Sequence, residues 1–209
     1  MSQIALPLGA GQDRPLQLAV GTDNQAVLEA LQVCRSWPFR TAVLSGPPRS
    51  GKSLIAQLFA HSGAGEAIDD ADQLDETVLF HRWNRAQETE TPLLLVRGNW
   101  ARNRNDGEWA IALPDLASRI GAALPLTIGT PDDAQLRELI AAHAQQRGLA
   151  LGPDAAEYLV PRCERSHLGV ERLVDTIDRL SLERKIAPTL GIWREALEIL
   201  HGPAEPRLL

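Results

Sequence analysis

Two kinds of apolar pattern alternate along the first 130 residues of the chain. Short continuous apolar runs predict strands, because a strand that is covered on both faces carries apolar residues at successive positions. Apolar residues spaced three or four positions apart predict helices. The predicted strands lie at residues 42–44, 66–70, 92–96 and 124–128, and the helices between them at 54–59, 77–87 and 112–120. This alternation predicts an α/β domain with a parallel sheet.

The pattern changes after Gly129-Thr130-Pro131, because every later apolar run has helical spacing. Apolar stripes at 136–143, 170–180 and 193–200, with a shorter helix that opens at Pro153, predict a module of four helices. The sequence therefore predicts three parts. They are an N-terminal tail at 1–17, an α/β base at 18–130 and a helical part at 131–209.

The first predicted strand runs into a glycine-rich segment that ends in Gly51-Lys52-Ser53. Strand, G-x-x-x-x-G-K-[ST] and helix in this order predict a phosphate-binding loop, and an ordinary Gly/Pro-rich turn is the alternative. In such a loop the backbone N–H groups and a lysine hold the phosphates, and the serine hydroxyl holds Mg²⁺. Only Lys52 and Lys185 are lysines among 21 basic residues, which favours a specific role for Lys52. The predicted phosphate contacts are Gly46, Pro47, Pro48, Arg49, Ser50, Gly51, Lys52 and Ser53.

The predicted second strand ends in two acids, Asp69 and Asp70. Carboxylates at the end of a strand beside a phosphate loop suit a Mg²⁺ ion, so Asp69 is the expected metal ligand together with Ser53. Asp70 is then placed to orient or deprotonate a water molecule. The alternative is a cluster of helix caps, in which Asp72 would share. The next strand ends at Arg97-Gly98-Asn99, which places the polar Asn99 at the same sheet edge.

Composition narrows the class of protein. The formal net charge of −6 argues against a domain that wraps nucleic acid by bulk electrostatics. The two cysteines form no C-x-x-C motif, and neither a signal peptide nor a membrane-spanning apolar run is visible. These observations predict a cytoplasmic protein with no membrane partner.

Near the N-terminus the chain reads Gln3-Ile4-Ala5-Leu6-Pro7-Leu8. Such a segment is either a terminus without fixed structure or a short peptide whose leucines dock in the groove of another protein. It is similar to the Q-L-[SD]-L-P-L pattern with which bacterial proteins bind the sliding clamp of DNA polymerase. The expected clamp contacts are Gln3, Ile4, Leu6, Pro7 and Leu8.

The order of these motifs resembles an AAA+ module. Phe80-His81-Arg82-Trp83-Asn84 resembles the F-H-x-[FL]-N segment of the replication initiator DnaA, and Ala117-Ser118-Arg119-Ile120 resembles the S-R-[FL] box that carries an arginine finger. Gly21-x-Asp23-Asn24, followed by LEAL, resembles the entry to the nucleotide site in Hda. The chain is therefore similar to the Hda family of DnaA-related regulators, and its arginine-rich bias is nearest to the alphaproteobacterial HdaA form.

The resemblance implies a P-loop base with a helical lid, a bound ADP or ATP with Mg²⁺, and Asn24 and Asn99 in the nucleotide site. It implies that the protein inhibits replication initiation by docking on the clamp and stimulating ATP hydrolysis by DnaA. Arg119 would then act in trans, and the protein's own ATPase would be weak at most. Because only Gly202 to Leu209 follow the lid, no sequence-specific DNA binding is expected. Self-association stays open.

Two departures from the family pattern change these expectations. Only Leu54 to Ile68 separates Ser53 from Asp69, which is too short for the helix and strand usually found there, so a sheet of four strands is predicted. The lid position that normally offers an arginine to the γ-phosphate falls on Glu171, with Arg172 beside it. Which of the two occupies that position stays open, and Arg172 is the candidate nucleotide contact. Three other functions remain open: a self-sufficient ATPase of the helicase-loader type, a clamp-binding adaptor without nucleotide switching, and a small-molecule kinase.

Overall fold

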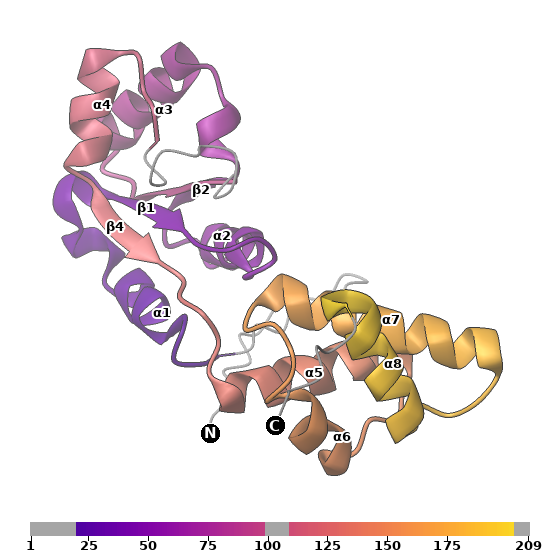
Figure 1. Cartoon of the computed structure of the whole chain (residues 1–209). Helices are drawn as coiled ribbons and strands as arrows, with labels where there is room; N and C mark the ends of the chain where they lie inside the picture. The colour runs from indigo at the N-terminus through magenta and orange to yellow at the C-terminus, as the bar shows by residue number, and fades with distance from the viewer. Residues whose placement is uncertain (1–19, 99–108, 203–209) are drawn as a thin grey trace, which may run out of the picture. The chain divides into compact units, whose positions relative to one another are not determined.

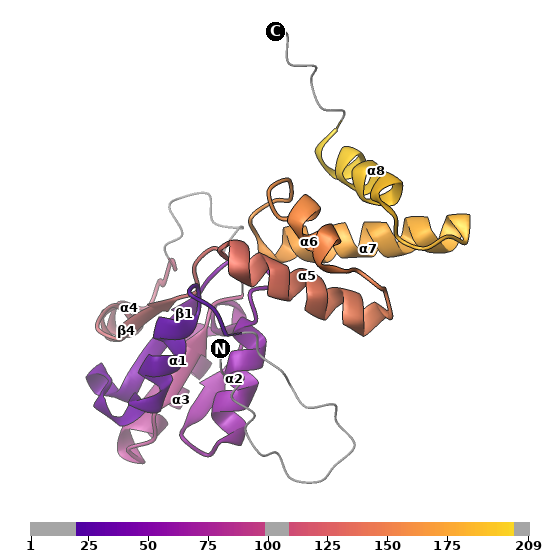
Figure 2. The same ribbon diagram turned by 90° about the horizontal axis from the view of Figure 1, so that it is seen from below.

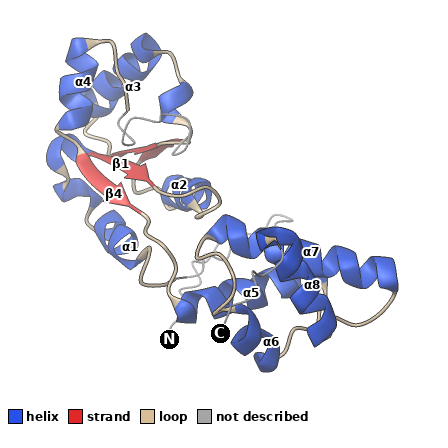
Figure 3. Ribbon diagram, viewed as in Figure 1, coloured by secondary structure: helices blue, strands red, loops and turns tan. Residues whose placement is uncertain are grey.

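The computed structural model describes residues 20–98 and 109–202. The chain divides into two compact units, one ending at Gly129 and the other beginning at Thr130. The predicted clamp peptide at residues 3–8 and the predicted site residue Asn99 lie outside the described residues. The first unit holds every described strand, and the second is built of helices (Figure 3).

The first unit is organised around a parallel sheet of four strands in the order β2-β3-β1-β4 (Figure 1). This confirms the predicted four-stranded sheet: β3 lies between the phosphate-loop strand and the acid strand, and β2 is at the edge. Among the described residues no further strand lies between the helix after the glycine-rich loop and β2, as the short spacing between Ser53 and Asp69 predicts. The strands are β1 (Thr41–Ser45), β2 (Glu66–Ile68), β3 (Leu93–Val96) and β4 (Leu124–Thr127).

Helices cover both faces of this sheet. Leu94 and Val96 of β3 face a core with the first two helices, whereas Leu93 and Leu95 face a core with the other two. All four side chains are fully buried, which explains why this strand reads as a continuous apolar run. The helices are α1 (Gln25–Gln32) and α2 (Lys52–His61) on one face, and α3 (Glu76–Glu88) and α4 (Pro114–Gly121) on the other.

The two ends of the sheet carry different segments. β1 leads directly into the glycine-rich loop at its carboxyl end. At its amino end Thr41 lies beside the last turn of α3, because Gln87 Nε2 lies 3.5 Å from Thr41 Oγ1. β4 begins at the same end, since Leu124 pairs with Ala42. Each polar side chain of the site can therefore be assigned to the carboxyl ends or to the amino ends of the strands.

The second unit is a module of four helices around an apolar core. The long helix α7 packs along α5 and against α8 (Figure 2), and its residues Val170, Leu173 and Ile177 are almost fully buried. Ser166 caps α7 by accepting the N–H of Gly169 at 2.9 Å. The helices are α5 (Asp133–Arg147), α6 (Pro153–Leu159), α7 (His167–Arg184) and α8 (Leu190–His201). Within the described ranges, no helix has the length and apolar character needed to cross a membrane.

Candidate nucleotide-binding site and the Arg119 surface

The glycine-rich loop lies between β1 and α2, as the motif predicts, and its backbone depends on its glycines. Gly51 precedes α2 with φ 86°, a left-handed conformation that glycine adopts without steric cost. At Gly46 a Cβ atom would lie 2.9 Å from the Cβ of Ile128, so a side chain would collide with the end of β4. Arg49 also has a positive φ of 65°. The sequence thus folds locally into a loop whose N–H groups lie at the start of a helix, where anions bind.

Lys52 is the buried cation of this loop, with 7% of its surface exposed. Its Nζ donates hydrogen bonds to the carbonyl oxygens of Gly46 at 3.0 Å and Pro47 at 2.8 Å. Burial lowers the pKa of Lys52, and the neighbouring carboxylates, of which Asp69 acts most strongly, offset part of that effect. Phosphate oxygens are better acceptors for a desolvated ammonium group than the loop's own carbonyls.

Two serines test whether the loop fits a nucleotide with Mg²⁺. Ser50 is 2% exposed, and its Oγ has no hydrogen-bond partner among the described residues. A buried hydroxyl without a partner is costly, and a phosphate oxygen beside the loop would satisfy it. Ser53, in the first turn of α2, is exposed and free of the core. Both serines therefore fit the group that the motif predicts.

The acids lie at the carboxyl end of β2, and Asp69 and Asp70 are both exposed. Asp69 Oδ1 accepts the N–H of Asp70 at 3.1 Å. Asp70 has φ 48° and lies against Gly98, where an added Cβ would come within 1.8 Å of Asp70 Oδ1. α3 is capped by Asp75, whose Oδ1 accepts the N–H groups of Thr77 and Val78. Neither Asp69 nor Asp70 is therefore the cap of that helix.

The acids and the loop belong to one electrostatic group. Asp69, Asp70 and Asp72 all act on the pKa of Lys52, which places their charge around the same cation. Asp72 was not singled out from the sequence as a site residue, yet its Oδ1 accepts the N–H of Gly98 at 2.8 Å and so fixes the end of β3. Its place in the acidic cluster with Asp69 and Asp70 is visible in the sequence, but nothing there indicates the bond to Gly98.

Asn24 is 1% exposed, and its Oδ1 accepts the N–H of Gly21 at 3.0 Å. It lies just before α1, where it closes a turn. The neighbouring Asp23 carbonyl accepts the N–H of Gly129 at 2.9 Å, which ties this turn to the segment that follows β4. The Asn24 side chain thus stabilises the turn that precedes α1. A contact between Asn24 and a nucleotide remains a prediction.

Arg119 lies in the last turn of α4 and is held by three side chains of α3. Its guanidinium carbon lies 4.4 Å from the ring centroids of both Phe80 and Trp83, within the range of cation–π attraction. Its Nη1 donates to Asn84 Oδ1. Phe80, Trp83 and Asn84 lie at helical spacing on one side of α3, so the F-H-x-W-N segment and the S-R-I box meet at Arg119. The sequence indicated both segments, but it did not show that they meet.

Arg119 lies near the amino ends of the strands, whereas the phosphate loop lies at their carboxyl ends. Asn84, which holds it, is one turn before Gln87, and Gln87 contacts the residues just before β1. The five residues of β1 span roughly 16 Å, because a strand rises by about 3.3 Å per residue. An arginine side chain cannot cross that distance. The Arg119 guanidinium therefore does not reach the phosphate loop of its own chain.

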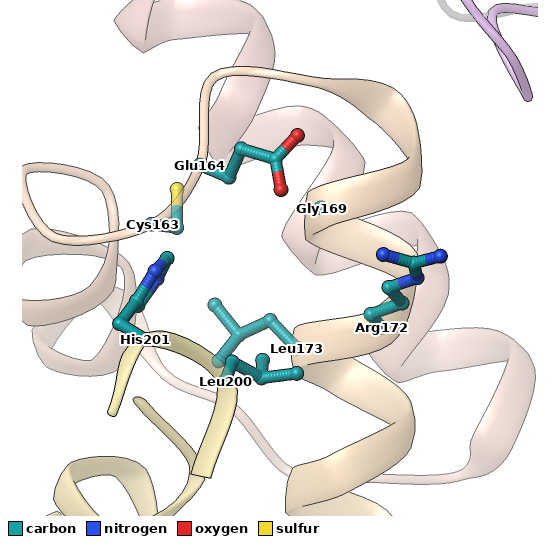
Figure 4. A pocket seen from close by; sticks show the side chains of 7 residues that line it. All are labelled: Cys163, Glu164, Gly169, Arg172, Leu173, Leu200 and His201. Atoms are coloured by element: carbon teal, nitrogen blue, oxygen red, sulfur yellow. The ribbon is translucent and has the colours of Figure 1, made fainter. Parts of the chain in front are cut away.

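In the second unit, Arg172 and Glu171 lie on α7. Arg172 is exposed and lines a small pocket between the start of α7 and the end of α8 (Figure 4). Burial raises the pKa of the Cys163 thiol in this pocket, so the thiol is a weak nucleophile. Glu171 is half-buried. The residues around the pocket are Cys163, Glu164, Gly169, Arg172, Leu173, Leu200 and His201.

Comparison with known proteins agrees with this geometry. Residues 132–196 match the family described as the Hda lid domain. The fold is similar to domain III of the Thermotoga maritima replication initiation protein DnaA, with a TM-score of 0.67, 12% identity, and coverage of 88% of this chain and 95% of that chain. It is also similar to the Thermotoga maritima RuvB Holliday junction branch migration motor, with a TM-score of 0.59, 18% identity, and coverage of 87% and 70%.

A further structure, the replication initiator DnaA bound to AMPPCP and single-stranded DNA, has a TM-score of 0.52 at 18% identity, with coverage of 79% of this chain and 65% of that chain. The sheet order, the phosphate loop and the helical second unit give the chain the fold of AAA+ modules such as domain III of DnaA and RuvB. Within that fold, residues 132–196 form a lid of the Hda type.

Proposed function

We propose that this protein is a nucleotide-bound negative regulator of DNA replication initiation. It docks on the sliding clamp and stimulates ATP hydrolysis by DnaA through Arg119 in trans. The observation that carries this proposal is the position of Arg119, which is fixed on the surface but lies a strand's length from its own phosphate loop. Such an arginine can serve the nucleotide of another chain. The Hda-type lid and the DnaA-like fold support DnaA as that partner.

The chain's own nucleotide has a separate role in this proposal. Lys52, Ser50 and the loop N–H groups would bind the phosphates, and Ser53 and Asp69 would hold Mg²⁺. The metal neutralises phosphate charge and orients the phosphate oxygens. Asp70 is restrained by Gly98 and positioned to orient a water molecule. The expected position of the lid arginine falls on Glu171 by register, with Arg172 beside it, and hydrolysis in cis should be slow where Glu171 fills that position.

Arg119 would stabilise the charge that develops on the transferred phosphoryl group of DnaA-bound ATP. An arginine supplied in this way contributes about 10³- to 10⁵-fold in rate. Its two aromatic contacts restrict the side chain before the partner arrives, so less conformational entropy is lost on binding. The short segment at residues 3–8 would bring the protein to the clamp.

The test measures turnover of ATP bound to DnaA in the presence of clamp loaded on DNA. The wild-type protein should accelerate turnover, and Arg119→Ala should reduce it to the rate of DnaA alone while nucleotide binding by the variant is unchanged. Arg119→Lys should also fail, because lysine lacks the planar fork of donors. Arg179→Ala is the matched control, since Arg179 pairs only locally with Glu183 on the lid surface. Full activity of Arg119→Ala would overturn the proposal.

The same assay separates the rival functions. A self-sufficient ATPase would turn over ATP without DnaA and lose that activity on Asp70→Asn. A clamp-binding adaptor without nucleotide switching would tolerate Lys52→Ala but fail after deletion of residues 3–8. Either result would contradict the proposed function.

A further inference from the structure

Phe39 is an exposed aromatic residue in an unusual backbone conformation. It has φ 48°, and the next residue, Arg40, has φ 49°, so two consecutive residues with side chains lie in the left-handed region. Such a conformation costs free energy for any residue with a Cβ atom. It persists only where the surroundings impose it, and it is concentrated at functional sites.

Several contacts impose this conformation on Phe39. Its carbonyl oxygen accepts hydrogen bonds from Gln87 Nε2 at 2.7 Å and from Thr41 Oγ1 at 3.0 Å. The Arg40 guanidinium pairs with Glu90 at 3.3 Å. The segment is therefore tied to the end of α3 and to β1, and the direction of the Phe39 side chain is fixed by its backbone.

The fixed direction is outward. Trp37, two residues earlier, is 4% exposed and stacks on Phe59 at 5.7 Å between ring centroids, as expected for a core aromatic. Phe39 is 58% exposed. The chain thus maintains a strained turn that holds one aromatic ring in the core and the next on the surface. An exposed ring that is held rigidly loses little entropy when it is buried against another protein.

Phe39 lies next to the aromatic residues that hold Arg119. Its ring centroid lies 6.4 Å from that of Trp83, and Trp83 is one of the two rings that hold the Arg119 guanidinium. Trp83 itself is buried, with 8% of its surface exposed, so a chain whose nucleotide reaches Arg119 approaches the exposed ring of Phe39 beside it. Aromatic residues with arginine are the usual centres of binding energy in protein interfaces.

We infer that Phe39 is a partner-binding residue, an aromatic anchor that packs against the surface beside the nucleotide of the AAA+ partner. This inference rests on the proposed function, in which Arg119 acts on that nucleotide. The partner is ATP-bound DnaA, and the ring contributes affinity, whereas the guanidinium contributes rate. Phe39 touches no reacting atom, so its loss changes how much protein is needed and leaves the maximal rate intact.

The decisive variant is Phe39→Asn, because asparagine tolerates the left-handed region and removes the ring without breaking the turn. It should unfold at the same temperature as the wild type or higher, and it should bind nucleotide equally well. In the turnover assay with ATP-bound DnaA and DNA-loaded clamp, the concentration for half-maximal stimulation should rise about tenfold, with the same maximal rate. Phe39→Trp should restore the wild-type concentration.

Val33→Ala is the matched control. Val33 is also 58% exposed, but it ends α1 on the opposite face of the sheet, so its removal should leave the half-maximal concentration unchanged. An unchanged value for Phe39→Asn, while Arg119→Ala still loses stimulation, would overturn the anchor and leave the proposed function standing. An effect of Phe39→Asn confined to self-association of the chain would show a second copy as the occupant and overturn DnaA in that role. Retained stimulation by Arg119→Ala would overturn the proposed function itself.

Discussion

In the first unit, the polar side chains at the carboxyl ends of the strands differ from those at the amino ends in how far their contacts are satisfied within the chain. At the carboxyl edge, Lys52 bonds to carbonyls of its own loop and Ser50 has a buried hydroxyl without a partner among the described residues. At the amino edge, Arg119 already has two aromatic rings and an amide oxygen around it. The polar groups at the carboxyl ends fit a phosphate group, whereas the Arg119 cation at the amino ends already has its contacts within the chain. Under the proposed function, the carboxyl ends of the strands bind this chain's nucleotide, and Arg119 at the amino ends serves the nucleotide of a partner.

The largest expected effect comes from Lys52→Met, which removes the charge from the carboxyl edge. Nucleotide binding should weaken by about 2–5 kcal/mol, because a buried charged partner of the phosphates is lost. The free energy of unfolding should change by less than about 1 kcal/mol, because the desolvation cost of the ammonium disappears with its two hydrogen bonds. Calorimetric titration and thermal unfolding would measure the two quantities.

The wild-type protein provides a pH test of the same edge. The pKa of Lys52 lies below the ordinary lysine value of 10.5, so the charge in the free protein is lost earlier as the pH rises. From neutral to alkaline pH the affinity for nucleotide should therefore fall with a midpoint below 10.5, as the Lys52 ammonium loses its proton. A fall only above that value would contradict the assigned burial of Lys52.

A smaller effect is expected for Gly98→Ala, which tests how closely Asp70 is held. The new methyl group would overlap the Asp70 carboxylate, so this exposed side chain would have to turn into another conformation, at a cost of about 0.5–1.5 kcal/mol. Stability should fall by that small amount, and Mg²⁺-dependent nucleotide binding should fall with it. Gly121→Ala on the Arg119 helix is the control, since a Cβ there meets nothing within 4 Å and should stabilise α4 by about 0.5–1 kcal/mol. Equal destabilisation by Gly98→Ala and Gly121→Ala would show that Asp70 is held no more closely than the surroundings of Gly121.

The smallest effect is expected for Asn84→Ala at the amino edge. Arg119 would keep its two rings but lose its bond to the amide oxygen, so its direction would be less restricted. The maximal stimulated rate should fall about tenfold, much less than for Arg119→Ala, and nucleotide binding should not change. A loss as large as that of Arg119→Ala would show that the rings alone do not position the guanidinium.

The fold could be read from the sequence because its signals are local. The continuous apolar run of β3 and the spacing between Ser53 and Asp69 predicted a parallel sheet of four strands, and the structure confirms it. The phosphate loop is equally local, since glycines, lysine and serine act within one turn. What these residues bind in this chain stays a prediction.

The remaining features depend on contacts between distant segments. Asp72 and Gly98 are 26 residues apart, and Arg119 and Asn84 are 35 apart, so no spacing in the sequence indicates either bond. Phe39 gave no signal either, because an aromatic residue near a strand normally belongs to a core. Only its backbone angle and its exposure distinguish it from Trp37.

The shortened sheet also has a consequence for colloidal behaviour. β2 is a terminal strand of the sheet, and terminal strands with free backbone groups can pair with other chains and start aggregation. β2 has three residues, and its Glu66 side chain is engaged by Arg82 of α3. A short strand that begins with a charged residue is a poor template for such pairing. β2 is therefore a poor starting point for fibril formation, although it is an outermost strand.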